Sequence, residues 1–272
     1  MPGGFPAEGP LSNGTNLAFN LVVPPGATAN TKGSYVQVSA SCPIDACAVL
    51  VQIISNPQGV NQTLIAMDIA IGAPGSETVI IPNILVDTGA QGGQTEFSAK
   101  FPIQIAKGTR IAARSQTNIA AGANYLTLQV DVFDGEFTKS EGFGIADAIG
   151  ISGAPLLGTN VVPNALAAVM GTYSQLIAST TVNYYGFVMN MDMRGIPGGN
   201  TAYWVDLALG PPGSERVIFP TFVFVAKANS MLCPNTSFIS ISIPAGSRIA
   251  ARCASSAAAD THTIGVGLYG VH

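Results

Sequence analysis

Residues 243–252 read IPAGSRIAAR, and a closely similar stretch, IAKGTRIAAR, occupies residues 105–114. The two copies lie 138 positions apart, as Arg248 and Arg110 show. In each copy a glycine that can turn the chain separates two apolar, alternating segments. This pattern is typical of a strand, a tight turn and a second strand.

Other motifs recur at the same displacement: DIAIGAPGSE returns as DLALGPPGSE, and VIIP returns as VIFP (residues 68–77 and 206–215, 79–82 and 217–220). Near the start of each copy GTN occurs at residues 14–16 and 158–160, which are 144 positions apart and suggest that copy two has lost six residues. A constant displacement across separate motifs indicates that the chain is a tandem duplication of one domain.

Each copy contains short apolar runs with period-two alternation, bounded by Gly, Pro, Asn and Asp, and no convincing amphipathic helix. The runs of the first copy predict eight strands, at residues 17–23, 35–39, 48–54, 64–71, 79–86, 97–105, 110–115 and 125–133. Those of the second copy begin near Val161 and continue at 173–177, 184–191, 203–209, 217–225, 238–243, 248–253 and 263–269. Residues 165–170 could form one helical turn where copy one has Pro24, Pro25 and Gly26.

Eight short strands per copy favour a two-sheet β-sandwich of the jelly-roll type. An immunoglobulin-like sandwich usually has seven strands and a Cys…Trp…Cys pattern, whereas this chain has a single Trp. We therefore predict an all-β protein with two tandem eight-stranded jelly-roll-like domains. The predicted units are an extended N-terminal arm, a first domain, a Gly-rich linker and a second domain (residues 1–12, 13–136, 137–154 and 155–272).

The composition restricts the class of protein. Only 10% of residues are charged while 47% are hydrophobic, the reverse of a disordered chain. Large subunit interfaces are depleted in charge, so we expect a homo-oligomer or a component of an assembly. The net charge of −4 and the scattered 11 Lys and Arg argue against nucleic acid as a partner. No apolar run approaches the length of a membrane span, and the N-terminus lacks the pattern of a signal peptide.

The chain has four cysteines, Cys42, Cys47, Cys233 and Cys253. At the equivalent position of the other copy, each is replaced by a different residue type. The duplicated domain therefore does not require them. We expect buried small apolar side chains, with an intra-domain disulfide, Cys42–Cys47 or Cys233–Cys253, as the alternative in a non-reducing environment.

Sequence signatures of catalysis are missing: there is no nucleophile elbow, phosphate-binding loop or dinucleotide fingerprint. Only two histidines occur. Asp131, Asp134 and Glu136 could crowd a calcium ion, but their spacing fits no loop motif, so solvated strand ends are favoured. We predict no enzyme activity, no metal and no cofactor.

Arginines and acids recur in both copies. Arg110 and Arg114 lie four apart on a strand and therefore share one face, as do Arg248 and Arg252. Two acids also recur at equivalent positions: Asp68 corresponds to Asp206, and Glu77 corresponds to Glu215. Either these arginines pair with the carboxylates of their own sandwich, or the arginine face lies at a subunit interface. The turns at residues 72–77 and 210–215 are interpreted as structural rather than anion-binding, because no helix or basic partner follows them.

The two motifs GxPGSExVIxP and IPAGSRIAAR together resemble virion structural proteins of tailed bacteriophages, in particular jelly-roll proteins that decorate or cement the outer surface of the head. The resemblance covers both copies and implies a non-enzymatic protein that self-associates and binds the major capsid protein of the same virion. It implies a location on the outer head surface after synthesis in the host cytoplasm. Two domains in one chain depart from the single-sandwich members of this class.

An alternative is a tail-fibre or spike module that binds a host surface carbohydrate, because jelly rolls also hold such sites. Sugar sites usually expose aromatic side chains. The best candidates here are Trp204, Tyr184, Tyr185 and Tyr203.

Overall fold

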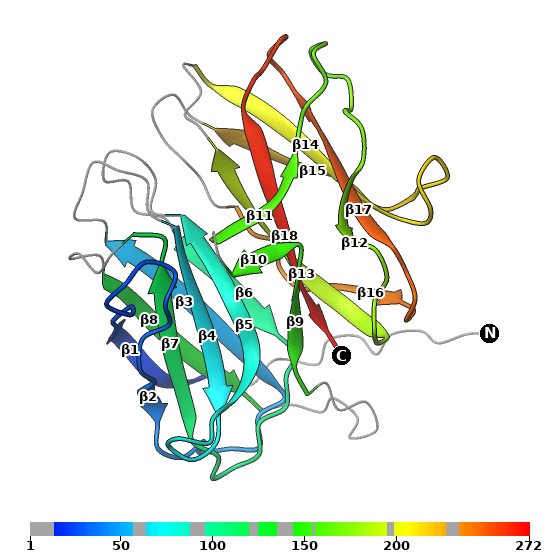
Figure 1. The fold of residues 1–272 in the computed structure, drawn as a ribbon. Coiled ribbons are helices and arrows are strands. Elements are labelled where there is room, and N and C mark those ends of the chain that lie inside the picture. Colours follow the sequence, from blue (N-terminus) through cyan, green and yellow to red (C-terminus); the bar gives the residue numbers. More distant parts are fainter. Residues whose placement is uncertain are drawn as a thin grey trace.

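The computed structural model describes residues 14–56, 64–87, 96–119, 125–134, 144–153, 156–194, 199–226 and 234–272, all of them strands, turns or irregular segments. The predicted N-terminal arm at residues 1–12 lies outside the described residues. Among the described residues, no helix is long and apolar enough to span a membrane. The all-β prediction is confirmed, and Figure 1 shows the two β-rich units beside each other.

The first domain consists of eight strands in two four-stranded sheets, ordered β1-β8-β3-β6 and β2-β7-β4-β5. The first strand, β1, pairs with the last, β8, and the second strand, β2, pairs with β7. The chain therefore resembles one long hairpin folded into a sandwich, which is the jelly-roll arrangement. The strands are β1 (Thr15–Val23), β2 (Val36–Ser39), β3 (Ala48–Asn56), β4 (Leu64–Ile71), β5 (Thr78–Asp87), β6 (Glu96–Phe101), β7 (Ile111–Thr117) and β8 (Tyr125–Phe133).

The second domain repeats this order as β11-β18-β13-β16 and β12-β17-β14-β15. Its strands are β11 (Leu156–Val161), β12 (Ser174–Ile177), β13 (Tyr184–Arg194), β14 (Thr201–Leu209), β15 (Arg216–Ala226), β16 (Ile239–Ile243), β17 (Ile249–Ser255) and β18 (Thr263–Val271). The two-domain jelly-roll prediction is thereby confirmed. The expected strand over residues 97–105 is shorter and ends at Phe101, next to Pro102, which has no N–H to donate to a ladder.

The predicted linker is too long. Two additional strands, β9 (Ala146–Ile149) and β10 (Ile151–Gly153), occupy its second half. Strand β9 pairs with β18, and β10 pairs with β11, so both belong to the second domain. The glycines at 144, 150 and 153 suggested a connector, but they only delimit these short strands.

The suggestion that copy two has lost six residues is also wrong. In the first domain Thr15 pairs with Val132. The residue equivalent to Val132 is Gly270, 138 positions later, and Gly270 pairs with Asp147. The place of Thr15 is therefore taken by Asp147 and not by Thr159. Copy two instead carries an insertion in its first strand, and the β10 hairpin lies within it.

The expected helical turn at residues 165–170 is a bend followed by a hydrogen-bonded turn. Ala168 has a left-handed backbone with φ 59°, and Asn30, its equivalent in copy one, has φ 57°. The duplicated loop keeps one conformation although Asn, which tolerates positive φ, has been replaced by Ala.

Both cores follow from the alternation of strand side chains. On β3, for example, Val49, Val51 and Ile53 point inward and are fully buried, whereas Leu50 and Gln52 point outward and are half-buried. The strand pattern thus fills a separate apolar core in each sandwich.

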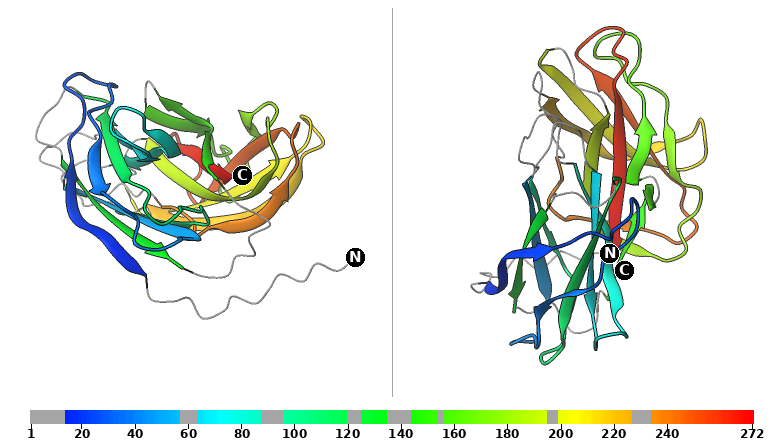
Figure 2. Two further views of the ribbon diagram at one scale, coloured as in Figure 1. Left: turned by 90° about the horizontal axis from the view of Figure 1, so that it is seen from below. Right: turned by 60° about the vertical axis from the view of Figure 1, so that its left-hand side comes forward.

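The second domain covers one open side of the first. The outer face of its β13–β18 pair approaches β5 and β6, and Tyr269 packs edge-on against Phe97 and Phe101, with centroid distances of 6.1 Å for both. Tyr269 Oη accepts a hydrogen bond from the Leu85 N–H (2.7 Å) and donates one to the Asn83 carbonyl (3.0 Å). Figure 2 shows the resulting side-by-side arrangement of the two domains.

Further polar contacts join the domains. The Asn190 amide donates to the Leu85 carbonyl. Asn235 and Ser98 exchange two hydrogen bonds, and Gln116 donates to the Gly153 carbonyl at 2.7 Å. The domains are therefore joined by buried apolar and polar contacts as well as by the chain itself.

Candidate functional site

The first repeated arginine clamps a hairpin turn. Arg110 Nη1 donates to the Gly72 carbonyl and to Glu77 Oε1, both at 3.0 Å, while its Nε donates to Gln37 at 3.4 Å. Glu77 Oε2 accepts the Gly75 N–H at 2.9 Å. Burial alone would raise the pKa of Glu77, but these hydrogen bonds and the arginine charge outweigh it and lower the pKa.

The second domain repeats the clamp atom for atom. Arg248 Nη1 donates to the Gly210 carbonyl (2.9 Å) and to Glu215 Oε1 (3.1 Å), and its Nε donates to Gln175 (3.0 Å). Glu215 Oε2 accepts the Gly213 N–H at 2.8 Å. Both GxPGSE turns are therefore held by the arginine that immediately precedes the neighbouring strand, β7 or β17, which agrees with the structural interpretation of that motif.

The second arginine of the first copy holds an irregular edge strand. Arg114 Nε donates to Asp68 Oδ2 at 2.9 Å and the guanidinium stacks 4.6 Å from the Tyr35 ring centre. Asp68 Oδ1 accepts from Lys32 Nζ and from the Asn83 N–H, both at 2.8 Å. Asn83 has φ 50° and lies where the β4–β5 register shifts. The carboxylate thus pins a β-bulge.

Copy two keeps this arrangement with one cation fewer. Arg252 donates to Asp206 Oδ2 through Nε (3.1 Å) and Nη2 (2.9 Å), and stacks over Tyr173. Asp206 Oδ1 accepts the N–H of Thr221, which has φ 50°. Met170 occupies the sequence position equivalent to Lys32.

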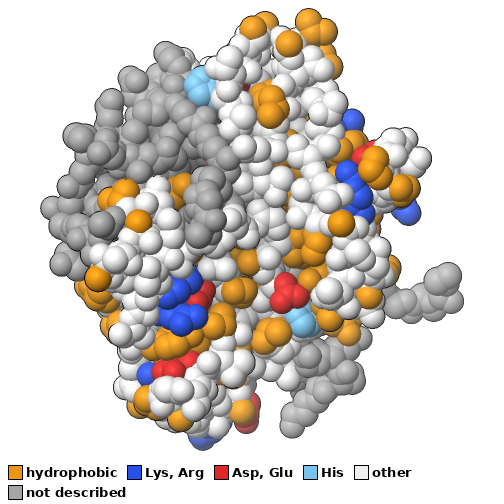
Figure 3. Space-filling model, in the orientation of Figure 1, with side chains coloured by type: hydrophobic (Ala, Val, Ile, Leu, Met, Phe, Trp, Pro, Cys, Tyr) orange, Lys and Arg blue, Asp and Glu red, His pale blue; other side chains and the backbone are white. Residues whose placement is uncertain are grey.

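The structure therefore brings all eight predicted residues together as four ion pairs, each within its own sandwich (Arg110–Glu77, Arg114–Asp68, Arg248–Glu215 and Arg252–Asp206). Sequence reasoning missed Lys32, Gln37 and Tyr35. Gln37 and Tyr35 recur as Gln175 and Tyr173, so their recurrence in both copies could have identified them as partners of the arginines. Figure 3 shows charged side chains gathered in a few small groups among apolar and neutral surface.

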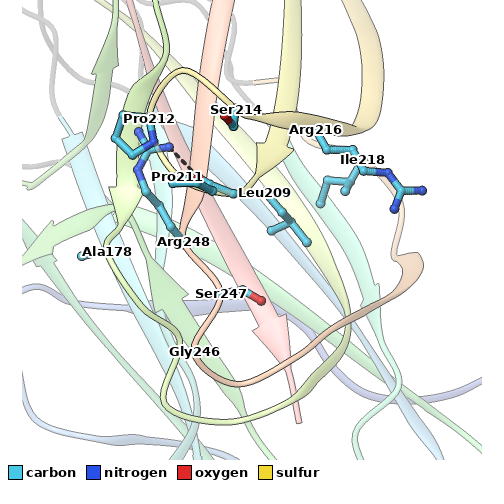
Figure 4. A pocket seen from close by; sticks show the side chains of 11 residues that line it. Ala178, Leu209, Pro211, Pro212, Ser214, Arg216, Ile218, Gly246, Ser247 and Arg248 are labelled. Carbon is cyan, nitrogen blue, oxygen red and sulfur yellow. Dashed lines mark hydrogen bonds between the residues drawn. The ribbon is translucent and has the colours of Figure 1, made fainter.

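An open hollow of about 610 Å³ lies beside the second clamp. Its walls come from the turn after β14, the start of β15 and the turn before β17, with Leu209, Pro211, Ile218 and Arg248 among the lining residues. Figure 4 shows the Arg248 guanidinium bonded to the turn, whereas Arg216 extends away from it. The two arginines therefore do not converge on a common point in the hollow.

The described cysteines are buried and free. Cys42 and Cys47 do not form the alternative disulfide, and Cys253 is a free thiol; Cys233 lies outside the described residues. Burial, followed by the negative charge of Asp260, raises the pKa of Cys253 to about 12, so this thiol is protonated near neutral pH and is a poor nucleophile.

The sequence did not indicate an interaction between His262 and Asp260. Asp260 accepts hydrogen bonds from the backbone N–H (3.0 Å) and the ring Nδ1 (2.6 Å) of His262. These bonds tie the β17–β18 loop to itself. Within the described ranges, no group of three or more His, Cys, Asp or Glu side chains is placed to hold a metal ion.

The four aromatic residues considered for sugar binding do not form one exposed platform. Tyr184 and Tyr203 are buried, Trp204 is half-buried and only Tyr185 is exposed. Tyr184 Oη donates to Asp147 at 2.8 Å and Tyr203 stacks on Phe224, so both serve the core.

The loop between β11 and β12, residues 162–170, exposes apolar side chains. Val162, Leu166 and Val169 are 51%, 65% and 42% exposed. The equivalent residues of copy one are Pro24, Thr28 and Thr31, and the two threonine hydroxyls bond to each other at 2.7 Å. We call residues 162–170 the apolar loop. It runs beside β17, through a Pro163–Cys253 bridge and the Ala168–Ser255 hydrogen bond.

Comparisons with known proteins do not identify a family. No family model matches the chain, and no curated protein matches it. Among solved structures, it resembles the N-terminal CBM22-1–CBM22-2 tandem domain of Paenibacillus barcinonensis Xyn10C, with 10% identity, a TM-score of 0.30 and coverage of 91% of this chain and 84% of that one. Tripeptidyl peptidase 2 matches with 7% identity, a TM-score of 0.25 and coverage of 92% and 22%. Neither likeness bears on function.

Proposed function

We propose that this chain is a non-enzymatic structural protein of a virion, a decoration protein that binds the outer surface of a bacteriophage head and stabilises it. The observation that carries the proposal is the apolar loop: the loop is exposed in both copies, but its exposed positions are apolar in the second copy and are Pro24, Thr28 and Thr31 in the first. Exposed apolar clusters on proteins otherwise poor in charge are typical of protein–protein contact sites.

The remaining chemistry of the chain agrees with this role. The repeated arginines and acids hold turns and bulges, and the described thiols are buried and protonated. A protein that binds only the assembled shell stabilises that shell by mass action, so two rigid sandwiches and a contact surface are sufficient.

Binding to heads that lack the protein tests this proposal. Purified chain should co-sediment with such capsids and saturate at a fixed number of copies. Leu166→Asp should weaken binding at least about tenfold, because a carboxylate would have to be desolvated at the contact. Thr28→Asp, at the equivalent position of copy one, is the matched control and should bind as wild type.

Two results would oppose the proposal. Equal capsid binding by Leu166→Asp and wild type would exclude the apolar loop as the contact. Absence of capsid binding together with adhesion to host cells or glycans would support the alternative tail-fibre or spike module.

A further inference from the structure

The apolar loop is bonded to the segment between β17 and β18, residues 256–262, which we call the supporting loop. The Ala259 N–H of the supporting loop donates to the Ala165 carbonyl of the apolar loop at 2.8 Å. Leu166 directly follows Ala165 and is the most exposed large side chain of the apolar loop. Its position therefore depends on where the supporting loop holds Ala165.

The bond from Ala259 is made by a backbone of unusual conformation. Ala259 has φ 52°, in the left-handed region that a residue with a Cβ adopts only at an energetic cost. Such a conformation persists where the surrounding contacts fix the chain. The next residue, Asp260, provides a fixed point, because its side chain is only 3% exposed while its neighbours Ala259 and Thr261 are exposed.

The buried carboxylate of Asp260 is contacted from three elements. His262 of the supporting loop donates its backbone N–H to Oδ1, and the His262 ring Nδ1 lies 2.6 Å from the same oxygen. Burial alone would raise the pKa of Asp260, but its interactions with Ser255 of β17, with His262 and with Tyr203 of β14 outweigh that effect and lower the pKa. The ionised carboxylate thus ties the supporting loop to the ends of two strands.

The acid and its histidine are specific to the second copy. Asp260 and His262 correspond by sequence to Gly122 and Asn124, neither of which can supply a carboxylate. The same copy is the one whose adjoining loop exposes apolar side chains. The buried acid and the exposed apolar surface therefore occur together, as expected if they serve one task.

We propose that Asp260 is the positioning residue of the apolar loop. Its carboxylate fixes the supporting loop, and the supporting loop holds Ala165 so that Leu166 is presented in one arrangement. This inference rests on the proposed function, because the contact with the head shell is what uses that arrangement. A contact loop that is already ordered in the free protein loses less conformational freedom on binding, which increases its affinity.

Amide hydrogen exchange of the free, full-length chain tests the positioning without any capsid. In Asp260→Ala, the Ala259 and Ala168 amides should exchange at least about tenfold faster than in wild type, because the support of their hydrogen bonds is lost. Asn183→Ala is the matched control. Asn183 Oδ1 accepts the Ala245 N–H at 2.8 Å before the opposite end of β17, so this variant loses a bond of the same kind in the same domain. It should leave both amides as in wild type.

A conservative variant separates the role of the acceptor from that of the side-chain volume. Asp260→Asn keeps an oxygen that can accept the His262 N–H, so Ala259 should exchange within about threefold of wild type. If Asp260→Ala does not fold, His262→Asn, which copies Asn124, takes its place. This variant removes the ring contact alone and should still accelerate Ala259 exchange more than Asn183→Ala does.

Binding to heads that lack the protein then measures whether the arrangement is used. Asp260→Ala should bind at least about tenfold more weakly than wild type, because the apolar loop must first be ordered. Asp260→Asn and Asn183→Ala should bind within about threefold of wild type. Circular dichroism before each titration establishes that the variants are folded.

Unchanged exchange at Ala259 in Asp260→Ala, or equal acceleration in Asn183→Ala, would overturn the proposal. Faster exchange combined with wild-type capsid binding would also overturn it, since the ordered loop would then have no part in the contact. If wild type does not bind heads while Asp260→Ala alone accelerates exchange, the proposed function fails and the positioning of the loop by Asp260 stands.

Discussion

Asp68 is a side chain on which several elements depend. It accepts hydrogen bonds from Lys32, Arg114 and the N–H of Asn83, and its side chain is only 4% exposed. Removal of such an acceptor leaves buried donors unpaired, which costs more than the bonds themselves contribute. The duplication offers a comparison, because Asp206 performs the same task with a single cation.

We expect Asp68→Ala to lower the free energy of unfolding by about 2–4 kcal/mol, and Asp206→Ala to lower it by less. Lys32→Met, which copies Met170 of the second domain, should change stability by less than about 1 kcal/mol because Arg114 still pairs with Asp68. Urea titrations followed by circular dichroism measure these differences. Equal losses for the two aspartate variants would show that Lys32 does not contribute to the cost.

Glu77 makes the stability of its turn dependent on pH. Its pKa is lowered in the folded state from the ordinary value of 4.5, so the folded protein favours the ionised form. The stabilising contribution is therefore complete above pH 4.5 and is lost as the pH falls through the folded pKa. A group with a raised pKa would show the opposite trend.

Wild type should be more stable than Glu77→Gln at pH 7, and the gap should close progressively below pH 4.5. The same is expected for Glu215→Gln, because its pKa is lowered by the same hydrogen bonds against the effect of burial. Thermal melts at pH 7 and at pH 3 provide the measurement. A gap that persists unchanged at pH 3 would contradict the ion-pair origin.

Among the strands and loops, the segment after the first strand of each domain depends on a close approach of backbones. A Cβ on Gly33 would lie 2.5 Å from the Pro24 carbonyl oxygen, and one on Gly171 would lie 2.3 Å from that of Val162. Both neighbours are backbone atoms that cannot rotate away. The glycines thus allow this loop to fold back beside β7 or β17.

Gly33→Ala and Gly171→Ala should each cost at least about 2 kcal/mol, because the backbone must shift to relieve the overlap. Gly144→Ala is the control: no atom lies within 4 Å of its added Cβ, so its effect should stay within about 0.5 kcal/mol. Denaturant midpoints compare the three. For Gly171→Ala, the single tryptophan, Trp204, reports on the affected domain.

The assembled chain depends on Tyr269, which belongs to the second domain but packs in the core of the first. Tyr269→Phe keeps the ring and removes the hydroxyl. The Leu85 N–H then loses its acceptor in a buried position, and we expect a loss of about 1–3 kcal/mol.

The same variant should also weaken the coupling between domains. Calorimetry should detect one transition for wild type and a broader or divided one for Tyr269→Phe. Phe19→Leu, at a side chain that is 70% exposed, is a control that should leave the transition unchanged. A single, unshifted transition for Tyr269→Phe would show that this hydroxyl does not join the domains.

The strand pattern could be predicted from local sequence because it depends on neighbouring residues, and the repeat could be predicted because its motifs recur at one constant displacement. Alternation along residues 48–54 or 64–71 sets which side chains enter a core, and turn residues set where each strand stops. The arginine and acid pairs were also accessible, since duplicated charges in a chain poor in charge indicate a shared structural task. Their exact partners were not accessible, because Arg110 reaches Glu77 through the pairing of strands distant in sequence.

The sequence alone therefore determined the duplicated domain, its jelly-roll class, the positions of most strands and the residues of the ion pairs. Only the tertiary structure decided that residues 146–153 belong to the second domain, that Tyr269 completes the core of the first, and that Val223 remains exposed. These features depend on how one sandwich lies on the other. Equivalent positions such as Leu85 and Val223 carry similar apolar side chains, so local pattern cannot distinguish the covered copy from the uncovered one.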